Sequence, residues 1–585
     1  MNKTCKQCQK EFIVEDDDLE FYKKISPTFD GPEGAPLGGK VFEIPSPTLC
    51  RECRSQRRLV WRNEKKLYKR KSDLSDKSTI SVFSPDKPYK IFTQDEWSSD
   101  AWDPMEYGQD YDLDESFFSQ FDRLYKKVPK AALVNINNEN SDYLSYARGN
   151  KDSYLLFSAI DNEDCHYSTN IDNCQSSVDS LMVTECNLCY EAVDSQNCYE
   201  CRYIQECREC VNSAHLFDCK ECDHCLFCSG LRHKSYYAFN EKISKEEFEE
   251  LSKNLEDKTN LGKFQIIKKN TPRRCAKILK SENVSGDNIA NSKNCRVIFD
   301  TYGCEECAYL ARSVKASNCF DCDYAMANYC MEGLDVDQNA SKNIFCVSCW
   351  YGSNVYYSIN CYSSNNLFGC VGLRHKEYCI FNKQYSKEEY EKKVGEIIVK
   401  MQEAGEWGEF FPMSISPFGY NETVANEYFN LDKESAEKLG AKWQDDDFGL
   451  KFDGPFYEPK KDIQIYAENE KERQELLNGI LKCEISGKPF KITPQELALY
   501  IKMKVQIPTK HYDVRYQERF DSRNPRKLWH RKCMNEGPSF ASTFAKATVD
   551  KKATDGRCPN EFETTYAPDR PERVFCESCY QKSVI

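Results

Sequence analysis

The middle of the chain alternates short apolar patches with polar corners at a fixed spacing. Between residues 140 and 240, patches of Tyr, Val, Ile and Phe are separated by Asn, Asp, Ser and Gly. Cysteines recur every 21 residues, at Cys165, Cys186, Cys207 and Cys228. Apolar positions in this stretch do not follow the spacing of an amphipathic helix. The pattern predicts a β-solenoid with 21-residue coils, roughly four to five of them.

The same pattern occurs twice in tandem. Residues 151–250 align without a gap on residues 293–392, at an offset of 142 positions. The best-matched stretch is a closing motif, Gly-Leu-Arg-His-Lys, at residues 230–234 and 372–376. After each motif comes a serine followed three residues later by a glutamate, the capping box that opens a helix: Ser244 with Glu247, and Ser386 with Glu389. The sequence therefore predicts two solenoid copies, each closed by a helix.

Cysteine is the residue that most distinguishes the chain. There are 33, and most lie in the two solenoid copies. Between the copies, Cys189 aligns with Met331 and Cys198 with Ala340. A tetrahedral metal site loses its ion after such replacements, whereas a packed column accepts any small or soft side chain. We therefore interpret most solenoid thiols as packing residues. A redox or metal-cluster protein that uses the solenoid CxxC columns stays open as the alternative.

The N-terminal cysteines have a different spacing. Two CxxC pairs, Cys5 with Cys8 and Cys50 with Cys53, bracket a glycine-rich loop. Each pair chelates from one tight turn, and zinc prefers four such soft ligands in a tetrahedron. The segment after Cys53 is helical in character, so that the last two ligands are expected in the first turn of a helix. The spacing predicts a closed four-thiolate zinc site.

The C-terminal end repeats this module in degenerate form. The positions of the first site now read Cys483, Ser486, His511 and Val514, which supply too few ligands. A second set replaces it: Cys533, Cys558, Cys576 and Cys579. The N-terminal module has Ser72, Ser75, Thr93 and Glu96 at those four positions. We infer that the ancestral module had two sites and that each copy kept one, and we expect about two zinc ions per chain. A 22-residue insertion between Cys533 and Cys558 is expected to form a disordered surface loop.

Residues 1–75 carry a resemblance to a known kind of domain. Besides the CxxC pairs, they contain Phe12, Tyr22 and the segment Pro47-x-Leu49-Cys50-x-x-Cys53-Arg54. This combination resembles the zinc-ribbon, treble-clef-like domains of uncharacterised bacterial cysteine-rich proteins, at both termini once the degenerate copy is included. The resemblance implies zinc binding and attaches no activity.

Basic residues step by four through the N-terminal module, in a chain of net charge -13. On a helix they would form one cationic stripe, a surface suited to phosphates of RNA or DNA. The alternative is pairing within the protein, because residues 95–122 contain ten acidic residues and no Lys or Arg. The stripe and its C-terminal counterpart comprise Arg54, Arg58, Arg62, Lys66 and Arg70, and Arg515, Arg519, Arg523, Lys527 and Arg531.

These features predict a multi-domain, mainly β protein in which tandem β-solenoid copies are flanked by small treble-clef or zinc-ribbon modules with short helices. We divide it into residues 1–125, a zinc-ribbon module with a basic helix and an acidic segment; 126–258, the first solenoid copy with its capping helix; 259–405, the second copy with its capping helix; 406–475, an aromatic-rich connector; and 476–585, the degenerate zinc-ribbon module.

For function, we expect a cytoplasmic zinc-binding scaffold or adaptor with RNA, DNA or protein partners, rather than an enzyme. No run approaches about 18 apolar residues, and the first residues lack the apolar core of a secretory signal, so that no membrane association is expected. A carbohydrate-active β-helix enzyme is a further alternative, but no paired carboxylates of the kind it needs stand out.

Overall fold

The computed structural model describes residues 1–30, 39–305, 307, 311–314, 322–325, 332, 334, 341–446, 448–449, 451–536 and 558–584. The chain forms two compact units, each built from two separated stretches. Unit 1 comprises Met1–Leu133 and Ala276–Asp446, and unit 2 comprises Val134–Cys275 and Asp447–Ile585. Each unit therefore joins one terminal module to the solenoid copy that is more distant in sequence. The C-terminal insertion lies for the most part outside the described residues.

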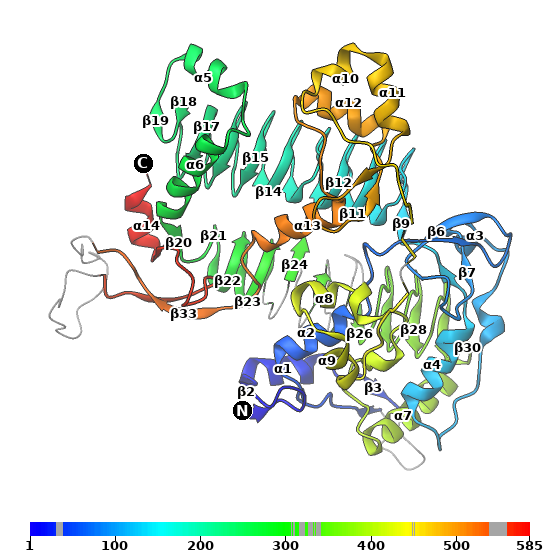
Figure 1. Ribbon diagram of the computed structural model, residues 1–585. Helices are drawn as coiled ribbons and strands as arrows, with labels where there is room; N and C mark the ends of the chain where they lie inside the picture. Colours follow the sequence, from blue (N-terminus) through cyan, green and yellow to red (C-terminus); the bar gives the residue numbers. More distant parts are fainter. Residues whose placement is uncertain are drawn as a thin grey trace. The chain divides into compact units, whose positions relative to one another are not determined.

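The first solenoid copy forms an 11-stranded sheet whose strands follow one another in chain order (Figure 1). Neighbouring strands are parallel, except for the last, β19, which returns antiparallel to β18. The strands are β9 (Asn135–Ile136), β10 (Ser145–Arg148), β11 (Tyr154–Ile160), β12 (His166–Asp172), β13 (Leu181–Thr184), β14 (Tyr190–Gln196), β15 (Arg202–Gln205), β16 (Ala214–Phe217), β17 (Asp223–Ser229), β18 (Ser235–Ala238) and β19 (Glu241–Lys242).

The coil is shorter than the sequence predicts. Thr169 pairs with Leu181, and Leu181 pairs with Val193, so that one coil contains 12 residues. Every third residue from 137 to 239 has a positive φ, which turns the chain after each triplet, and four triplets close a coil. The β-solenoid is confirmed, but the 21-residue coil was wrong. The cysteine step of 21 is two 12-residue coils less one triplet, so that each cysteine of this series lies nearly two coils beyond the previous one, at a neighbouring corner.

Such a small coil explains why cysteine and serine exchange at inward positions. The Cys189 thiol donates to the carbonyl of Asn187, two residues back, and to that of Cys198, nine residues ahead, both at 3.5 Å. The Ser177 hydroxyl donates to the two corresponding carbonyls at 3.1 and 3.5 Å. Its oxygen also accepts from Cys189 N, 12 residues on, at 3.4 Å. Both side chains are small enough for the narrow core and satisfy buried backbone groups there.

The second solenoid copy has the same coil. Ser341 pairs with Ser353 and Val355 with Leu367, again 12 residues apart. Its strands are β21 (Ile278–Leu279), β22 (Glu282–Ala290), β23 (Lys293–Tyr302), β24 (Ala311–Val314), β25 (Asp323–Ala325), β26 (Ser341–Ile344), β27 (Ser353–Tyr356), β28 (Asn365–Phe368), β29 (Glu377–Ile380) and β30 (Lys383–Gln384).

The predicted capping helices are present after both copies. Ser244 Oγ accepts from Glu247 N at 3.1 Å and opens α5 (Lys245–Ser252), which is followed by α6 (Lys258–Asn270). Ser386 Oγ accepts from Glu389 N at 3.2 Å and opens α7 (Lys387–Glu403).

The two terminal modules share the order hairpin, helix, helix, hairpin, strand and helix, to which the N-terminal module adds β3, β4, η1, α4 and β8. The N-terminal module contains β1 (Asn2–Thr4), β2 (Glu11–Ile13), α1 (Asp16–Ile25), β3 (Thr28–Phe29), β4 (Lys40–Val41), α2 (Arg51–Leu59), β5 (Tyr68–Lys71), β6 (Ser78–Ser81), β7 (Ile91–Phe92), α3 (Gln94–Ser98), η1 (Pro104–Tyr107), α4 (Phe117–Lys127) and β8 (Lys130–Ala131). The C-terminal module contains β31 (Leu481–Lys482), β32 (Pro489–Phe490), α12 (Pro494–Met503), α13 (Tyr512–Asp521), β33 (Trp529–Lys532), β34 (Glu561–Thr564), β35 (Val574–Phe575) and α14 (Glu577–Ser583). β35 pairs with β20 (Arg273–Arg274).

The segments between solenoid and module are aromatic-rich, and in unit 1 these aromatic rings pack. Phe411 is buried and its ring centroid lies 5.2 Å from that of Trp61 and 4.6 Å from that of Phe121. The connecting elements are η2 (Met413–Ile415), η3 (Tyr420–Glu422), α8 (Val424–Tyr428) and α9 (Lys433–Lys438) in unit 1, and α10 (Gln464–Glu468) and α11 (Glu470–Asn478) in unit 2.

Candidate metal centres

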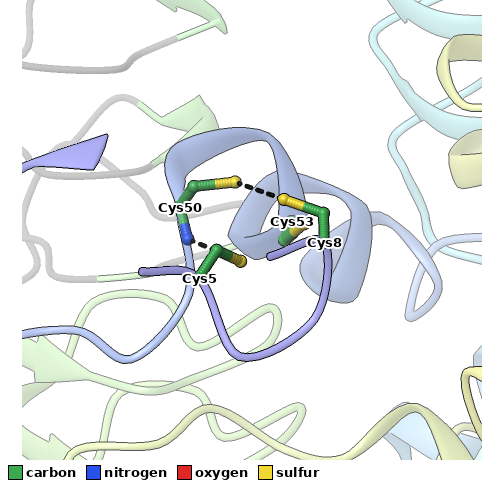
Figure 2. A group of neighbouring side chains, drawn as sticks. All are labelled: Cys5, Cys8, Cys50 and Cys53. Carbon is green, nitrogen blue, oxygen red and sulfur yellow. Dashed lines mark hydrogen bonds between the residues drawn. The ribbon is translucent and has the colours of Figure 1, made fainter. Parts of the chain in front are cut away.

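Four thiols of the N-terminal module converge on one point (Figure 2). The ligand atoms of Cys5, Cys8, Cys50 and Cys53 all lie within 4.8 Å of one another. Cys8 Sγ and Cys50 Sγ are 3.6 Å apart. Cys8 is half-buried and the other three are buried. Four thiols at this spacing suit a closed tetrahedral metal site, the kind that stabilises structure.

The local backbone explains how the two pairs meet. Cys5 and Cys8 lie in the turn between β1 and β2, which Gln9 closes with a φ of 61°. Cys50 is the N-cap residue of α2, and Cys53 lies in its first turn, as predicted. Cys50 N donates to Cys5 Sγ at 3.2 Å. Backbone N–H groups and the helix N-terminus favour the thiolate form that binds metal.

The C-terminal module holds the second predicted set. The ligand atoms of Cys533, Cys558, Cys576 and Cys579 also lie within 4.8 Å of one another. The first two stand at the inner ends of the β33–β34 hairpin, and Cys576 is the N-cap residue of α14. Cys576 N donates to Cys533 Sγ at 3.3 Å, the counterpart of the bond from Cys50 to Cys5. The structure thus brings together both predicted cysteine sets.

Hydrogen bonds favour an ionised thiol at each helix N-terminus. The side chain and the backbone N–H of Cys53 donate to Cys50 and lower its pKa to about 5, against the opposing effect of burial. Burial also disfavours the Cys576 thiolate, but hydrogen bonds from Ser578 and Asn560 outweigh it and lower the pKa of Cys576 to about 6. Asn560 Nδ2 lies 3.4 Å from Cys576 Sγ.

In the N-terminal module, the positions that align with the second cysteine set are joined by hydrogen bonds. Ser72 Oγ donates to Glu96, which also accepts from Thr93 N at 3.0 Å. Hydrogen bonds from Ser72 and Ser75 lower the pKa of Glu96 to about 2. The hairpin turn keeps its shape, since Ser72 N donates to Lys77 O at 2.8 Å, just as Cys533 N donates to Asn560 O at 2.9 Å in the other module.

The site that the C-terminal module lost is similarly rebuilt. Ser486 N donates to the Cys483 thiol at 3.3 Å. His511 caps α13, where its Nδ1 accepts from Asp513 N at 3.2 Å. Cys483 is the one thiol at these four positions, which fits the prediction that they supply too few ligands for a metal site.

The predicted basic stripe does not lie on one helix. α2 ends at Leu59 and α13 at Asp521, and the chain then turns into the β5 and β33 strands that carry Arg70 and Arg531. Arg54, Arg58, Arg62, Arg515 and Arg519 are buried, Arg70, Arg523 and Arg531 are half-buried, and Lys66 and Lys527 are exposed.

The buried members of this set have partners inside each unit. Arg54 Nη1 lies 3.3 Å from the Tyr22 hydroxyl, and Arg515 Nη1 lies 3.3 Å from the hydroxyl of the aligned Tyr500. In unit 2, Arg515 also pairs with Asp179 on the solenoid. The tyrosine contacts lie within each module, and the pair between Arg515 and Asp179 holds module to solenoid. Binding of RNA or DNA stays a prediction that rests on the more exposed members.

The repeated closing motif of the solenoid has a role that the sequence did not reveal. Arg232 Nη2 donates to the Tyr580 hydroxyl in α14 at 2.7 Å. The aligned Arg374 lies over the ring of Trp97 in α3, 5.5 Å from its centroid, and donates to Ser99 O at 2.9 Å. The arginine of each motif therefore holds the module that docks on that solenoid copy. The neighbouring His233 is exposed and pairs with Glu221 at 2.9 Å.

The described thiols of the solenoid are buried, except Cys275, which is half-buried. Within the described part of the chain, the two terminal tetrads are the groups whose ligand atoms all lie close enough to share an ion. Redox-active cysteines are usually accessible thiolates. The geometry therefore favours packing as the role of the inward solenoid cysteines.

No helix among the described residues is long and apolar enough to cross a membrane. Comparison with known proteins adds no family: no protein-family model matches the sequence, and no curated protein matches it.

Proposed function

We propose that the protein is a zinc-binding scaffold in which two four-thiolate centres stabilise the modules that dock on the solenoid copies. The observation that carries the proposal is the convergence of four thiols, twice, on positions that the two modules do not share. Thiolate sets without an open position are typical of structural zinc. The turn followed by a helix N-terminus is the arrangement expected of a treble-clef-like module.

The docking contacts support a scaffold role. Each module offers an acidic residue from the first turn of its first helix to its solenoid. Asp18 lies 2.7 Å from Arg296 Nη2 in unit 1, and the aligned Glu496 accepts from the Tyr167 hydroxyl at 2.8 Å in unit 2. Zinc stabilises a module of this size because it binds the four ligands where folding brings them together, and not in the unfolded chain. A stable module then presents a fixed surface on the solenoid to protein partners.

Elemental analysis of the purified, reduced protein tests the metal. We expect about two zinc atoms per chain. Cys53→Ser and Cys576→Ser should each remove one, and the double variant should remove both. Cys483→Ser is the matched control. It also replaces a buried cysteine of a terminal module, but one at a position where too few other ligands are present. Its zinc content should equal that of the wild type.

The identity of the ion is tested in the same measurement. Iron in place of zinc would contradict the zinc assignment while leaving the two ligand sets in place. A wild-type protein that carries neither metal after expression with zinc would contradict the proposal as a whole.

A further inference from the structure

The C-terminal metal centre lies beside the segment through which the chain leaves unit 2. The first stretch of that unit ends at Cys275. Just before this point, β20 pairs in parallel with β35, and β35 ends directly before the ligand Cys576. Arg273 N donates to Arg573 O at 2.7 Å, and Cys275 N donates to Phe575 O at 3.0 Å.

The helix that follows Cys576 adds side-chain contacts to the same region. Glu577 Oε2 lies 2.5 Å from Arg274 Nε. The Tyr580 hydroxyl donates to Asp218 and accepts from Arg232 Nη2 at 2.7 Å, both on the last coils of the solenoid. Glu577, which contacts the segment, and Tyr580, which contacts the solenoid, therefore alternate along the chain with the metal ligands Cys576 and Cys579.

The N-terminal module forms the corresponding clamp without thiols. β7 pairs in parallel with β8, just before Leu133, where the chain leaves unit 1. The helix α3 that follows β7 is held by Trp97, which is buried and donates to Pro129 O at 3.2 Å. At the ligand positions this module has the hydrogen-bonded Ser72 and Glu96.

The two clamps differ in what connects the short helix to the hairpin. In the N-terminal module the connection is a hydrogen bond. In the C-terminal module it is a set of four thiols. The helix is short in both modules, with 5 residues in α3 and 7 in α14. A helix this short has little stability of its own in water. At the four ligand positions, α14 is joined to the β33–β34 hairpin by hydrogen bonds that end on the ligand sulfurs, from Cys576 N to Cys533 Sγ at 3.3 Å and from Asn560 Nδ2 to Cys576 Sγ at 3.4 Å. Thiol sulfur is a weak acceptor, so that the coordination bonds of an ion would be the stronger connection.

We propose that the C-terminal centre is a metal-dependent latch on residues 271–275. Loss of its ion releases β20 from β35, while the equivalent segment around β8 stays in place. The proposal rests on the proposed zinc function and assigns the two centres different tasks. The N-terminal ion stabilises its own module, and the C-terminal ion controls whether the chain between the solenoid copies is held.

Hydrogen exchange of the full-length protein, followed by mass spectrometry, tests the latch. Cys579→Ser should lose one zinc and speed exchange of peptides covering 271–277 and 573–583 by at least about tenfold. Exchange around residues 128–133 should not change. Cys8→Ser is the matched control, because Cys8 is, like Cys579, a half-buried ligand, but belongs to the N-terminal centre. This variant should lose one zinc without changing exchange at 271–277.

If Cys579→Ser unfolds unit 2, the latch is tested instead by removing zinc from the wild type and then restoring it. Protection of the amides of 271–277 should fall when the C-terminal centre loses its zinc and should return when zinc is restored. Amides of the inner coils, residues 181–229, should stay protected throughout. If the C-terminal centre is empty, in folded Cys579→Ser or in the wild type with both zinc ions removed, and 271–277 keeps its protection, the latch is wrong and the zinc function stands. If the wild type holds no zinc, the zinc function itself fails.

Discussion

Arg519 Nη2 lies 3.0 Å from Asp179 Oδ1, and the two side chains are only 5% and 0% exposed. Asp179 occupies a left-handed corner of the solenoid, with a φ of 54°, and also receives Arg515. One carboxylate thus pairs with two guanidinium groups that the C-terminal module brings to the solenoid. Buried charges of this kind are stable only while paired.

Removal of this carboxylate should therefore uncouple the module from the solenoid. We expect Asp179→Ala to lower the free energy of unfolding of unit 2 by about 3–5 kcal/mol, because two buried cations lose their partner. Chemical denaturation of the full-length protein measures the change. Asp161→Ala is the matched control, since Asp161 occupies the same kind of left-handed corner but is exposed. A loss below about 1 kcal/mol at Asp179 would contradict the interpretation.

The inward solenoid thiols should tolerate serine and reject larger side chains. In Cys189→Ser the hydroxyl can make the same bonds to the Asn187 and Cys198 carbonyls, so that we expect a loss of about 1 kcal/mol or less. Cys189→Leu adds volume to a closed coil and should cost about 1–3 kcal/mol. Thermal unfolding compares the two variants, and neither should change the zinc content. A loss of zinc in Cys189→Ser would instead support the metal-cluster alternative.

Nucleic-acid binding, if the protein has it, should depend on the exposed lysines of the basic set. Lys66→Glu together with Lys527→Glu should weaken binding of a short RNA or DNA and flatten its dependence on salt. A gel-shift series at several salt concentrations measures this. Changes at the buried Arg58 are unsuitable, because they would disturb the module. Absence of any retention of the wild type at low salt would end this hypothesis.

Sequence periodicity predicted the solenoid and its duplication but misjudged the coil. The cysteines mark only some inward positions, since Ala192, Ser195 and Ile204 occupy others. The period of 21 residues, which was taken from the cysteines alone, therefore spans nearly two coils and does not give the length of one. The positive φ values show that the backbone repeats every three residues. This repeat cannot be recognised from one residue type in the sequence, because Asn, Asp, Glu, Tyr and Leu all occupy these corners.

The metal ligands were predictable because their chemistry demands fixed residue types, whereas the docking contacts were not. Four cysteines in two pairs specify a site almost without reference to the rest of the chain. Asp179 and Arg515 lie more than 330 residues apart in sequence, and nothing in either local pattern indicates the other. The spacing of the arginines suggested one helix, but the helix ends at Leu59, where the chain turns toward the β5–β6 hairpin.

Glu496 should make the stability of unit 2 depend on pH. It is 0% exposed, and burial raises its pKa above the ordinary value of 4.5, although Arg515 and hydrogen bonds from Tyr500 and Tyr167 oppose the shift. The folded state therefore holds this proton more tightly than the unfolded state does. Below about pH 4.5 Glu496 is protonated in both states and does not lower the free energy of unfolding. As the pH rises from there toward the raised pKa, the free energy of unfolding falls.

Glu496→Gln should remove this dependence. Relative to the wild type, the variant should gain stability between about pH 4 and pH 7, and the difference should vanish at the acid end. Urea denaturation at several pH values measures the difference in free energy of unfolding between the variant and the wild type. The contributions of all other titrating groups cancel in this difference. Glu468→Gln, outside this buried cluster, serves as the control. A difference that stays constant with pH would show that the pKa of Glu496 is the same in the folded and unfolded states, and would contradict the prediction.

The lost site of the N-terminal module should be recoverable. Its hairpin keeps the turn of the C-terminal centre, and the N-cap of α3, Thr93, takes the place of Cys576, the N-cap of α14. We expect the fourfold variant S72C, S75C, T93C and E96C to bind a third zinc, because the backbone already positions the four side chains. Elemental analysis measures the count, and the threefold variant that keeps Glu96 is the control, since one carboxylate among three thiolates should bind zinc more weakly. If the fourfold variant folds and still binds two, the hairpin and helix of this module have moved too far apart to form a site, and the inference of an ancestral two-site module loses its structural support.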